Sequence, residues 1–305
     1  MKRKRNFVWR AALVLLALTC ASTSIYFTNA KYITTESFTA GFKIYSLIGG
    51  TGSISDAPAG RWAFYVRGQT GGACNSRAGG NPGIIKGVYD KSVSGSLTVG
   101  STTRASNGGD WSGTGGNGGQ AMYILDDLSA IPSSITGIVA VAAGGGGSSP
   151  NHNSGNAGAN GGVDGGGTWA GYRAGDGSQT TSATGLNGGG GGTGSGGSGM
   201  SGQVILTSAD DGQSGSWFWG GKSGNIGGYN AGGGGVGLYG GGGGGLGVSS
   251  GAGGGGSSYS AAGGKIADLA PASGSYEAYA LAWYNEQVTT AGNNDLRAVL
   301  VWLGP

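Results

Sequence analysis

The stretch AGGGGVGLYGGGGGGLG, residues 231–247, contains twelve glycines and only four large side chains, those of Val236, Leu238, Tyr239 and Leu246. It is either a flexible Gly/Ser linker or part of a rigid array. The whole chain has 76 glycines in 305 residues, against a usual share of roughly 7%. A structureless stretch over residues 144–264 would far exceed normal loop lengths and would leave its aromatic side chains in water. We therefore predict that the glycine-rich region folds.

Polyglycine has a folded form with physical properties of its own. It is an extended helix of three residues per turn that has no internal hydrogen bonds, so neighbouring segments must satisfy its backbone donors. Without Cβ atoms such helices lie close together, joined by N–H···O and weaker Cα–H···O contacts. Ordering glycine costs more backbone entropy than ordering any other residue, so only a bundle is expected to be stable. A side chain added at an interior position such as Gly242 or Gly243 is then expected to clash.

The sequence on both sides of the glycine-rich region predicts β-strands. Within RWAFYVRG, the apolar residues Trp62, Phe64 and Val66 alternate with other residues, which indicates a strand with one buried face. The last forty residues contain two further predicted strands, YEAYALAWY and DLRAVLVWLG. The strands predicted before the glycine-rich region are separated by Gly, Asn, Asp and Pro turns: FKIYSLI (42–48), RWAFYVRG (61–68), GIIKGVYD (83–90), SGSLTVG (94–100), AMYILDD (121–127) and SITGIVAVAA (134–143).

The predicted fold is mainly β: an antiparallel β-sandwich joined to a bundle of polyglycine II helices, with little α-helix after a signal peptide. Four regions follow from this prediction. They are a signal peptide at 1–25, β-sandwich strands at 26–143, the polyglycine-helix bundle at 144–264, and C-terminal strands returning to the sandwich at 265–305.

The N-terminal segment MKRKRNFVWRAALVLLALTCAS has the layout of a secretory signal peptide, with basic residues at 2–5 before an apolar run at 11–18. The apolar run is shorter than the roughly 20 residues that span a bilayer; an uncleaved membrane anchor is the alternative. The residue before Cys20 is Thr19, whereas lipidation favours a smaller residue there. Five of the 17 Lys and Arg residues lie in this leader, leaving 12 against 14 Asp and Glu. The basicity therefore gives no indication of nucleic-acid binding.

Cysteine content restricts covalent cross-linking. Cys74 is the only thiol of the mature chain, so an intrachain disulfide is excluded. Pairing between chains stays open.

The segment after the leader resembles the start of Gram-positive biofilm-fibre and camelysin-type secreted proteins. The resemblance rests on Tyr26–Asn29 and on Phe38–Gly41, a Phe-x-Ala-Gly pattern. It implies export to the cell surface or matrix, with signal peptidase cutting between Ser22 and Ala30.

The glycine-rich region resembles the glycine-rich domain of the anaplastic lymphoma and leukocyte tyrosine kinase receptors and its bacterial secreted relatives. This resemblance implies a β-sandwich joined to polyglycine helices. The receptors' cysteines have no counterpart in the glycine tract, and the kinase motifs V-A-I-K, H-R-D and D-F-G do not occur. The resemblance rests on the ordered succession of SGSLTVG, IVAVAAGGGGSS (138–149), GGYNAGGGGVGLYGGGGGG (227–245) and AGGGGSSY (252–259).

Catalytic and metal-binding motifs are weak. His152 is the only histidine and lacks the sequence context of a Ser-His-Asp triad. One histidine and one mature cysteine do not make a zinc site. The Asp126–Asp127 and Asp210–Asp211 pairs could hold calcium or serve a glycosidase, but turn positions are favoured because neighbouring strand residues point to opposite faces.

Two glycine motifs that suggest nucleotide binding also fail. The G-K-S of residues 221–223 resembles a phosphate loop, but the aromatic residues 217–219 occupy the place where the backbone must curl around phosphate. A G-x-G-x-x-G match around 188–192 lacks a βαβ unit. We predict no enzymatic activity, no cofactor and no metal.

The function predicted is that of a secreted, non-enzymatic, glycine-rich protein of a Gram-positive cell surface or extracellular matrix, with a structural or adhesive role. Its expected partners are other surface or matrix proteins or cell-wall polymers, and not nucleic acid. The alternative is an extracellular module that binds a carbohydrate or a protein, and a remote third is a secreted hydrolase. The aromatic residues expected to serve as ligand contacts or as packing are Trp217, Phe218, Trp219 and Tyr239.

Overall fold

In a computed structural model, the described part of the protein is mainly β, with antiparallel sheets and one α-helix. The structure describes residues 32–38, 42–48, 52–102, 115–150, 212–226, 229–245, 251–290 and 296–305. Within these segments, no helix is both long and apolar enough to cross a membrane. The predicted leader and its cleavage site, Cys20, His152, Asp210–Asp211 and the glycines at 188–192 lie outside the described residues.

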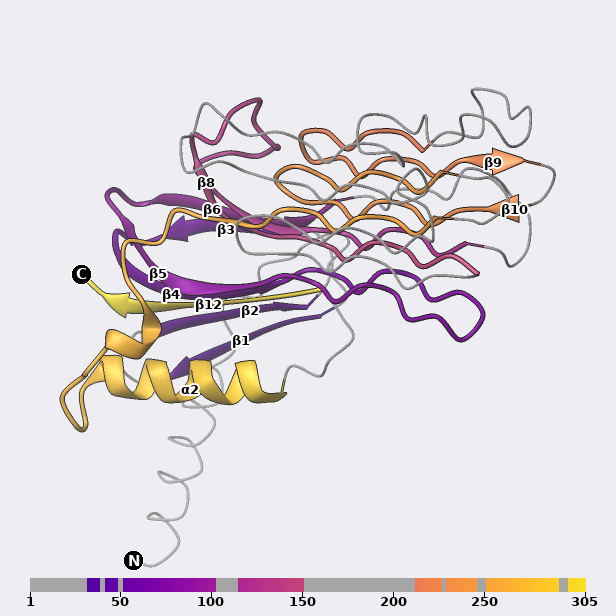
Figure 1. The fold of residues 1–305 in the computed structure, drawn as a ribbon. Helices are drawn as coiled ribbons and strands as arrows, with labels where there is room; N and C mark the ends of the chain where they lie inside the picture. Colours follow the sequence, from indigo (N-terminus) through magenta and orange to yellow (C-terminus); the bar gives the residue numbers. More distant parts are fainter. Residues whose placement is uncertain are drawn as a thin grey trace, which may run out of the picture.

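Two five-stranded antiparallel sheets form most of the regular structure (Figure 1). The first has the order β1-β2-β12-β4-β5 and the second β11-β8-β7-β6-β3, while β9 (Asn225–Ile226) pairs with β10 (Tyr229–Asn230). The strands of the first sheet are β1 (Tyr32–Phe38), β2 (Phe42–Ile48), β4 (Gly60–Arg67), β5 (Ile84–Lys91) and β12 (Arg297–Gly304). Those of the second are β3 (Gly52–Ala57), β6 (Gly95–Ser101), β7 (Met122–Asp126), β8 (Ile138–Ala142) and β11 (Tyr259–Ser260).

All six strands predicted before the glycine-rich region are confirmed to within a few residues, as is the final strand DLRAVLVWLG. Turn residues and apolar alternation were sufficient to find them. The short strand β3 was missed: only two of its six residues, Ile54 and Ala57, are buried hydrophobics.

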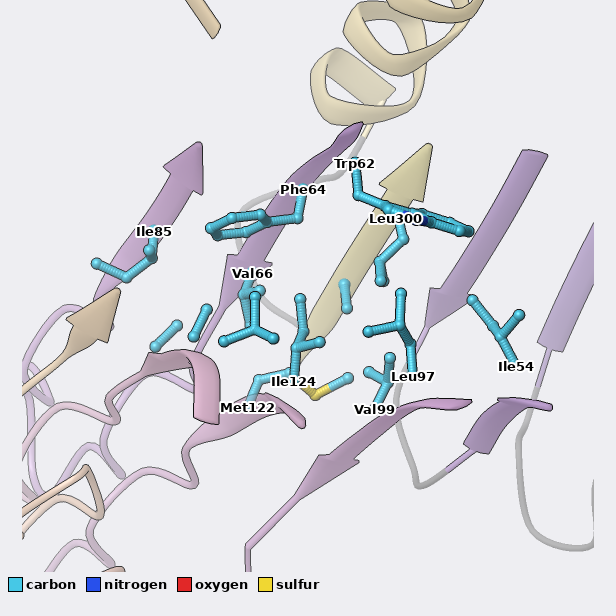
Figure 2. Close-up of a cluster of buried hydrophobic side chains, with 14 of the residues drawn as sticks. Ile54, Trp62, Phe64, Val66, Ile85, Leu97, Val99, Met122, Ile124 and Leu300 are labelled. Atoms are coloured by element: carbon cyan, nitrogen blue, oxygen red, sulfur yellow. The ribbon is translucent and has the colours of Figure 1, made fainter. Parts of the chain in front are cut away.

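The two large sheets share one hydrophobic core (Figure 2). Trp62, Phe64 and Leu300 enter it from the first sheet, and Leu97 and Ile124 enter it from the second. All five side chains are at most 2% exposed. Side chains from both sheets therefore pack in one cluster.

The prediction of one buried face for β4 is wrong, because both faces are covered. Trp62 and Phe64 point into the core shared by the sheets, whereas Ala63 and Tyr65 pack in a second core. This second core lies between the first sheet and helix α2 (Tyr276–Thr290), which covers the opposite face of that sheet (Figure 1).

The expectation of a strand at YEAYALAWY is also wrong, since these residues form α2. The residues that face the sheet recur every three or four positions, including Ala280, Trp283 and Tyr284, which is a helical period. Ser275 caps the helix, because its hydroxyl accepts the Ala278 N–H at 3.2 Å. The abundance of tyrosine and tryptophan suggests a strand, but the capping serine and the spacing of buried residues favour a helix.

One hydrogen bond fixes α2 to the sheet and provides a test of this packing. The hydroxyl of Tyr284, which is 2% exposed, donates to the Phe64 carbonyl at 3.1 Å. Burial raises the pKa of Tyr284, so the hydroxyl stays protonated and acts as a donor. We expect Tyr284→Phe to lower the free energy of unfolding by about 1 kcal/mol, measured by denaturant titration. An unchanged midpoint would contradict this docking contact.

The glycine-rich segments are joined to one another by backbone hydrogen bonds rather than by a ladder between two strands. Residues 232–236 donate to three different segments in rotation, and every third donor returns to the same segment. The bonds run from Gly232 to Gly251, Gly233 to Gly116, Gly234 to Gly221, Gly235 to Gly254 and Val236 to Gly119, at 2.9–3.0 Å.

A second segment shows the same period of three. Gly144 and Gly147 donate to Val236 and Gly233, whereas Gly145 and Ser148 donate to Gln69 and Gly72, at 2.7–3.1 Å. The bonding therefore reaches residues 69–72 and 116–119, which precede the region that the sequence assigns to the glycine tract. The reason is that short glycine runs inside the predicted strand region supply further neighbours.

Backbones approach so closely that no side chain fits between them. A Cβ added at Gly234 would lie 2.0 Å from the Gly241 oxygen, and one at Gly243 would lie 2.0 Å from the Lys222 oxygen. The expected clash at Gly243 is thus confirmed, and residues 231–245 are not a free linker.

Candidate functional site

The predicted aromatic residues come together at one turn of the glycine-rich region. Ser216 and Trp219 exchange two backbone hydrogen bonds, of 2.8 and 3.1 Å, and so close a tight turn over Trp217 and Phe218. Phe218 has a positive φ of 50°, which is unusual for a residue with a bulky side chain. Its N–H donates to Leu238 at 3.1 Å, which ties the turn to the neighbouring glycine segment.

Three of the four aromatic residues serve as packing. Trp217 lies edge-on to Tyr239 and Phe218, with ring centroids 5.3 and 5.5 Å apart, in the range of favourable aromatic pairs. Phe218 in turn contacts Tyr123 of the second sheet at 5.8 Å. The indole N–H of Trp217 donates to the Pro132 carbonyl at 2.7 Å. These contacts fasten the glycine segments to the second sheet.

Trp219 differs from the other three. It is 41% exposed, while its backbone is held within the turn on one side and by Gly240 on the other. A Cβ at Gly240 would lie 2.0 Å from the Trp219 oxygen. The turn therefore presents one indole to solvent from a fixed backbone.

A polar cluster lies between the two sheets and includes the Asp126–Asp127 pair, for which the sequence favoured turn positions over a calcium or glycosidase site. Lys91, at the end of β5, has a fully buried side chain, and its ammonium group pairs with Asp126 at the end of β7 and with Asp127, the latter at 3.2 Å. The Tyr89 hydroxyl donates to the other carboxylate oxygen of Asp126 at 2.5 Å. Asp126 and Asp127 are thus partners of a buried lysine.

Electrostatics and burial set the protonation of the cluster. Burial, followed by the hydrogen bond to Asp126, raises the pKa of Tyr89, which keeps the phenol as a donor. The backbone N–H of Ser96 and then the Lys91 ammonium lower the pKa of Asp127, which keeps it ionised. Gly95 makes room for this carboxylate, because a Cβ there would lie 2.0 Å from its Oδ1 atom.

The sequence carried a signal for Lys91 that was missed. Alternate residues of β5 point to the same face of the sheet, and Ile85, Tyr89 and Lys91 all belong to one such set. Two of them, Ile85 and Tyr89, pack against the core between the sheets. Alternation therefore places Lys91 on the inner face, where a lysine needs a partner.

The other candidate motifs hold no site in the described segments. No group of three or more His, Cys, Asp or Glu residues that could hold a metal occurs there. Residues 221–224, which include the G-K-S of the phosphate-loop match, are irregular and lead into β9 rather than into a helix. Cys74 lies in a turn with Arg77 and is buried, which raises the pKa of its thiol.

Comparison with known proteins adds no assignment to these two clusters: no protein-family model matches the chain, and no curated protein is similar to it in sequence.

Proposed function

We propose that the protein is a secreted, non-enzymatic component of a Gram-positive cell surface or extracellular matrix, with a structural or adhesive role. The observation that carries the proposal is the rotation of hydrogen bonds along residues 232–236 among three neighbouring segments. A segment bonded in three directions resists bending in each of them. Such a rigid body, made with few reactive side chains, suits a building material better than it suits a catalyst.

The proposed architecture is a β-sandwich joined to a bundle of polyglycine II helices. The core shared by the two large sheets supports the first part. The return to the same neighbour at every third residue supports the second, since polyglycine II has three residues per turn. The aromatic residues Trp217, Phe218 and Tyr239 then act as the fastening between the two parts.

Export through a cleaved leader is part of the same proposal. Its support is the basic and apolar layout of residues 1–25. The proposed partners are other surface or matrix proteins or cell-wall polymers. The exposed indole of Trp219 favours one alternative function, an extracellular module that binds a carbohydrate.

Co-sedimentation with insoluble cell-wall and matrix material distinguishes these functions. The structural or adhesive role predicts that the mature chain sediments with such material, that no soluble oligosaccharide competes, and that Trp219→Ala lowers the bound fraction by at most severalfold. A carbohydrate-binding module predicts full competition by one soluble oligosaccharide and loss of binding in Trp219→Ala. Tyr279→Ala is the matched control, because Tyr279 is an aromatic residue 69% exposed on α2. Absence of sedimentation and of self-association would contradict the structural role.

A further inference from the structure

The cluster of Lys91, Asp126, Tyr89 and Asp127 contains the parts of an amide-forming site. The Lys91 Nζ atom contacts Oδ1 of Asp126, while the Tyr89 hydroxyl holds Oδ2 of the same carboxylate at 2.5 Å. Asp127 Oδ2 lies 3.2 Å from Nζ. An amine, a carboxyl carbon, a hydrogen-bond donor for the developing oxyanion and a proton acceptor are thus brought together on fixed elements.

We propose that Lys91 and Asp126 condense to an intramolecular isopeptide bond that links β5 of the first sheet to β7 of the second. The Lys91 ammonium gives a proton to Asp127, and the neutral amine attacks Cγ of Asp126. Tyr89 stabilises the negative charge on Oδ2 in the tetrahedral intermediate. Oδ1 then leaves as water. One proton of this water is returned by Asp127, and the other comes from the attacking nitrogen, which keeps one proton in the amide. One ammonium and one carboxylate become one amide and one water, without any oxidant or co-reactant.

Burial of the ion pair and the fixed positions of its two groups both favour formation of the amide. The Lys91 side chain is fully buried, and a charged pair taken out of water carries a desolvation penalty that a neutral amide avoids. In addition, groups fixed in reacting geometry have effective molarities of about 10⁵–10⁸ M. The fixed placement of the Lys91 amine beside the Asp126 carboxyl group therefore accelerates condensation.

The position of the bond explains why a lysine is placed inside the core. β5 is an edge strand of the first sheet, and its last residue faces the end of β7 in the second. A covalent bond there would prevent the two sheets from separating at that end. No disulfide occurs among the residues that the structure describes, so the amide would supply a covalent cross-link between the sheets there.

Mass spectrometry of the folded wild-type chain decides the proposal. We expect the measured intact mass to be lower, by the mass of one water molecule, than the mass calculated from the sequence of the mature chain. After denaturation, trypsin should fail to cleave at Lys91, and fragmentation should identify a branched peptide joining Lys91 to the segment with Asp126. A full intact mass together with normal cleavage at Lys91 would overturn the proposal and leave an ion pair.

Succinimide formation at an aspartate also removes one water, so the digest must separate the two products. A succinimide lies within a single linear peptide and reverses in mild base, whereas the isopeptide stays branched. Finding only the linear dehydrated peptide would overturn the proposal.

Variants test the roles of the individual groups. Lys91→Arg keeps the charge but should abolish the loss of water, while Lys86→Arg, on an exposed position of the same strand, should retain it. Tyr89→Phe should slow the linkage about a hundredfold, the effect of losing one oxyanion donor. Dehydration that persists in Lys91→Arg would overturn the assignment. If that variant does not fold, the wild-type digest still gives the answer.

Discussion

Gly234→Val is expected to destabilise the protein by about 3 kcal/mol or more, through overpacking of about 1–3 kcal/mol and loss of hydrogen bonds worth about 1 kcal/mol each. The Gly234 N–H donates to Gly221 at 2.9 Å. A Cβ at this position would lie 2.0 Å from the Gly241 oxygen and 2.6 Å from the Gly241 carbonyl carbon. Both obstacles are backbone atoms, so no side-chain rotation relieves the clash.

Thermal unfolding and hydrogen exchange over residues 232–245 measure this effect. Gly263→Ala is the control, because its nearest neighbour is a side-chain oxygen of Asp90 at 3.5 Å, an ordinary contact. We expect protected amides in the wild type and a lower melting temperature only for Gly234→Val. Random-coil exchange in the wild type and an unchanged melting temperature in Gly234→Val would show that the segment is a tether.

Trp62→Ala is expected to lower the free energy of unfolding by about 3–5 kcal/mol, as large-to-small changes of a core aromatic do. Trp62 is 1% exposed in the core between the sheets, and its indole N–H donates to the Pro58 carbonyl at 3.0 Å. The change therefore leaves a cavity and an acceptor without its donor.

Trp219→Ala is the matched control for Trp62→Ala, since it makes the same chemical change at a residue 41% exposed. We expect its effect to stay within about 0.5 kcal/mol, as at most surface positions. Denaturant titration with a constant slope gives both values. Equal effects at the two positions would contradict the assignment of the shared core.

Sequence patterns were sufficient where side chains alone determine structure. The alternation of Trp62, Phe64 and Val66 located β4, but it did not show that α2 would cover the other face and bury Tyr65. That covering depends on a contact with residues more than 200 positions later. For α2, strand-forming aromatic residues masked a helical spacing that tertiary packing selects.

The glycine-rich region and the polar cluster show a different limit. Composition predicted that glycine would be the packing residue, and the spacing of backbones at Gly243 agrees with it. Composition carries no information on which segment each amide bonds, since all glycines are alike. Likewise, the alternation of residues in β5 places the Lys91 side chain on the face between the sheets. Its pairing with Asp126 depends on how the two sheets pack on each other.

The strand order of the first sheet has a consequence for how the chain reaches its final state. β12, residues 297–304, is inserted between β2 and β4 and pairs with both, so its neighbours on either side cannot join until it is in place. A chain that emerges gradually from a ribosome or an export channel therefore keeps this sheet open during most of its passage. Assembly becomes a late, all-at-once event dominated by contacts between distant residues, which favours slow folding. Under the export proposed above, the first sheet stays open until residues 297–304 have crossed the membrane.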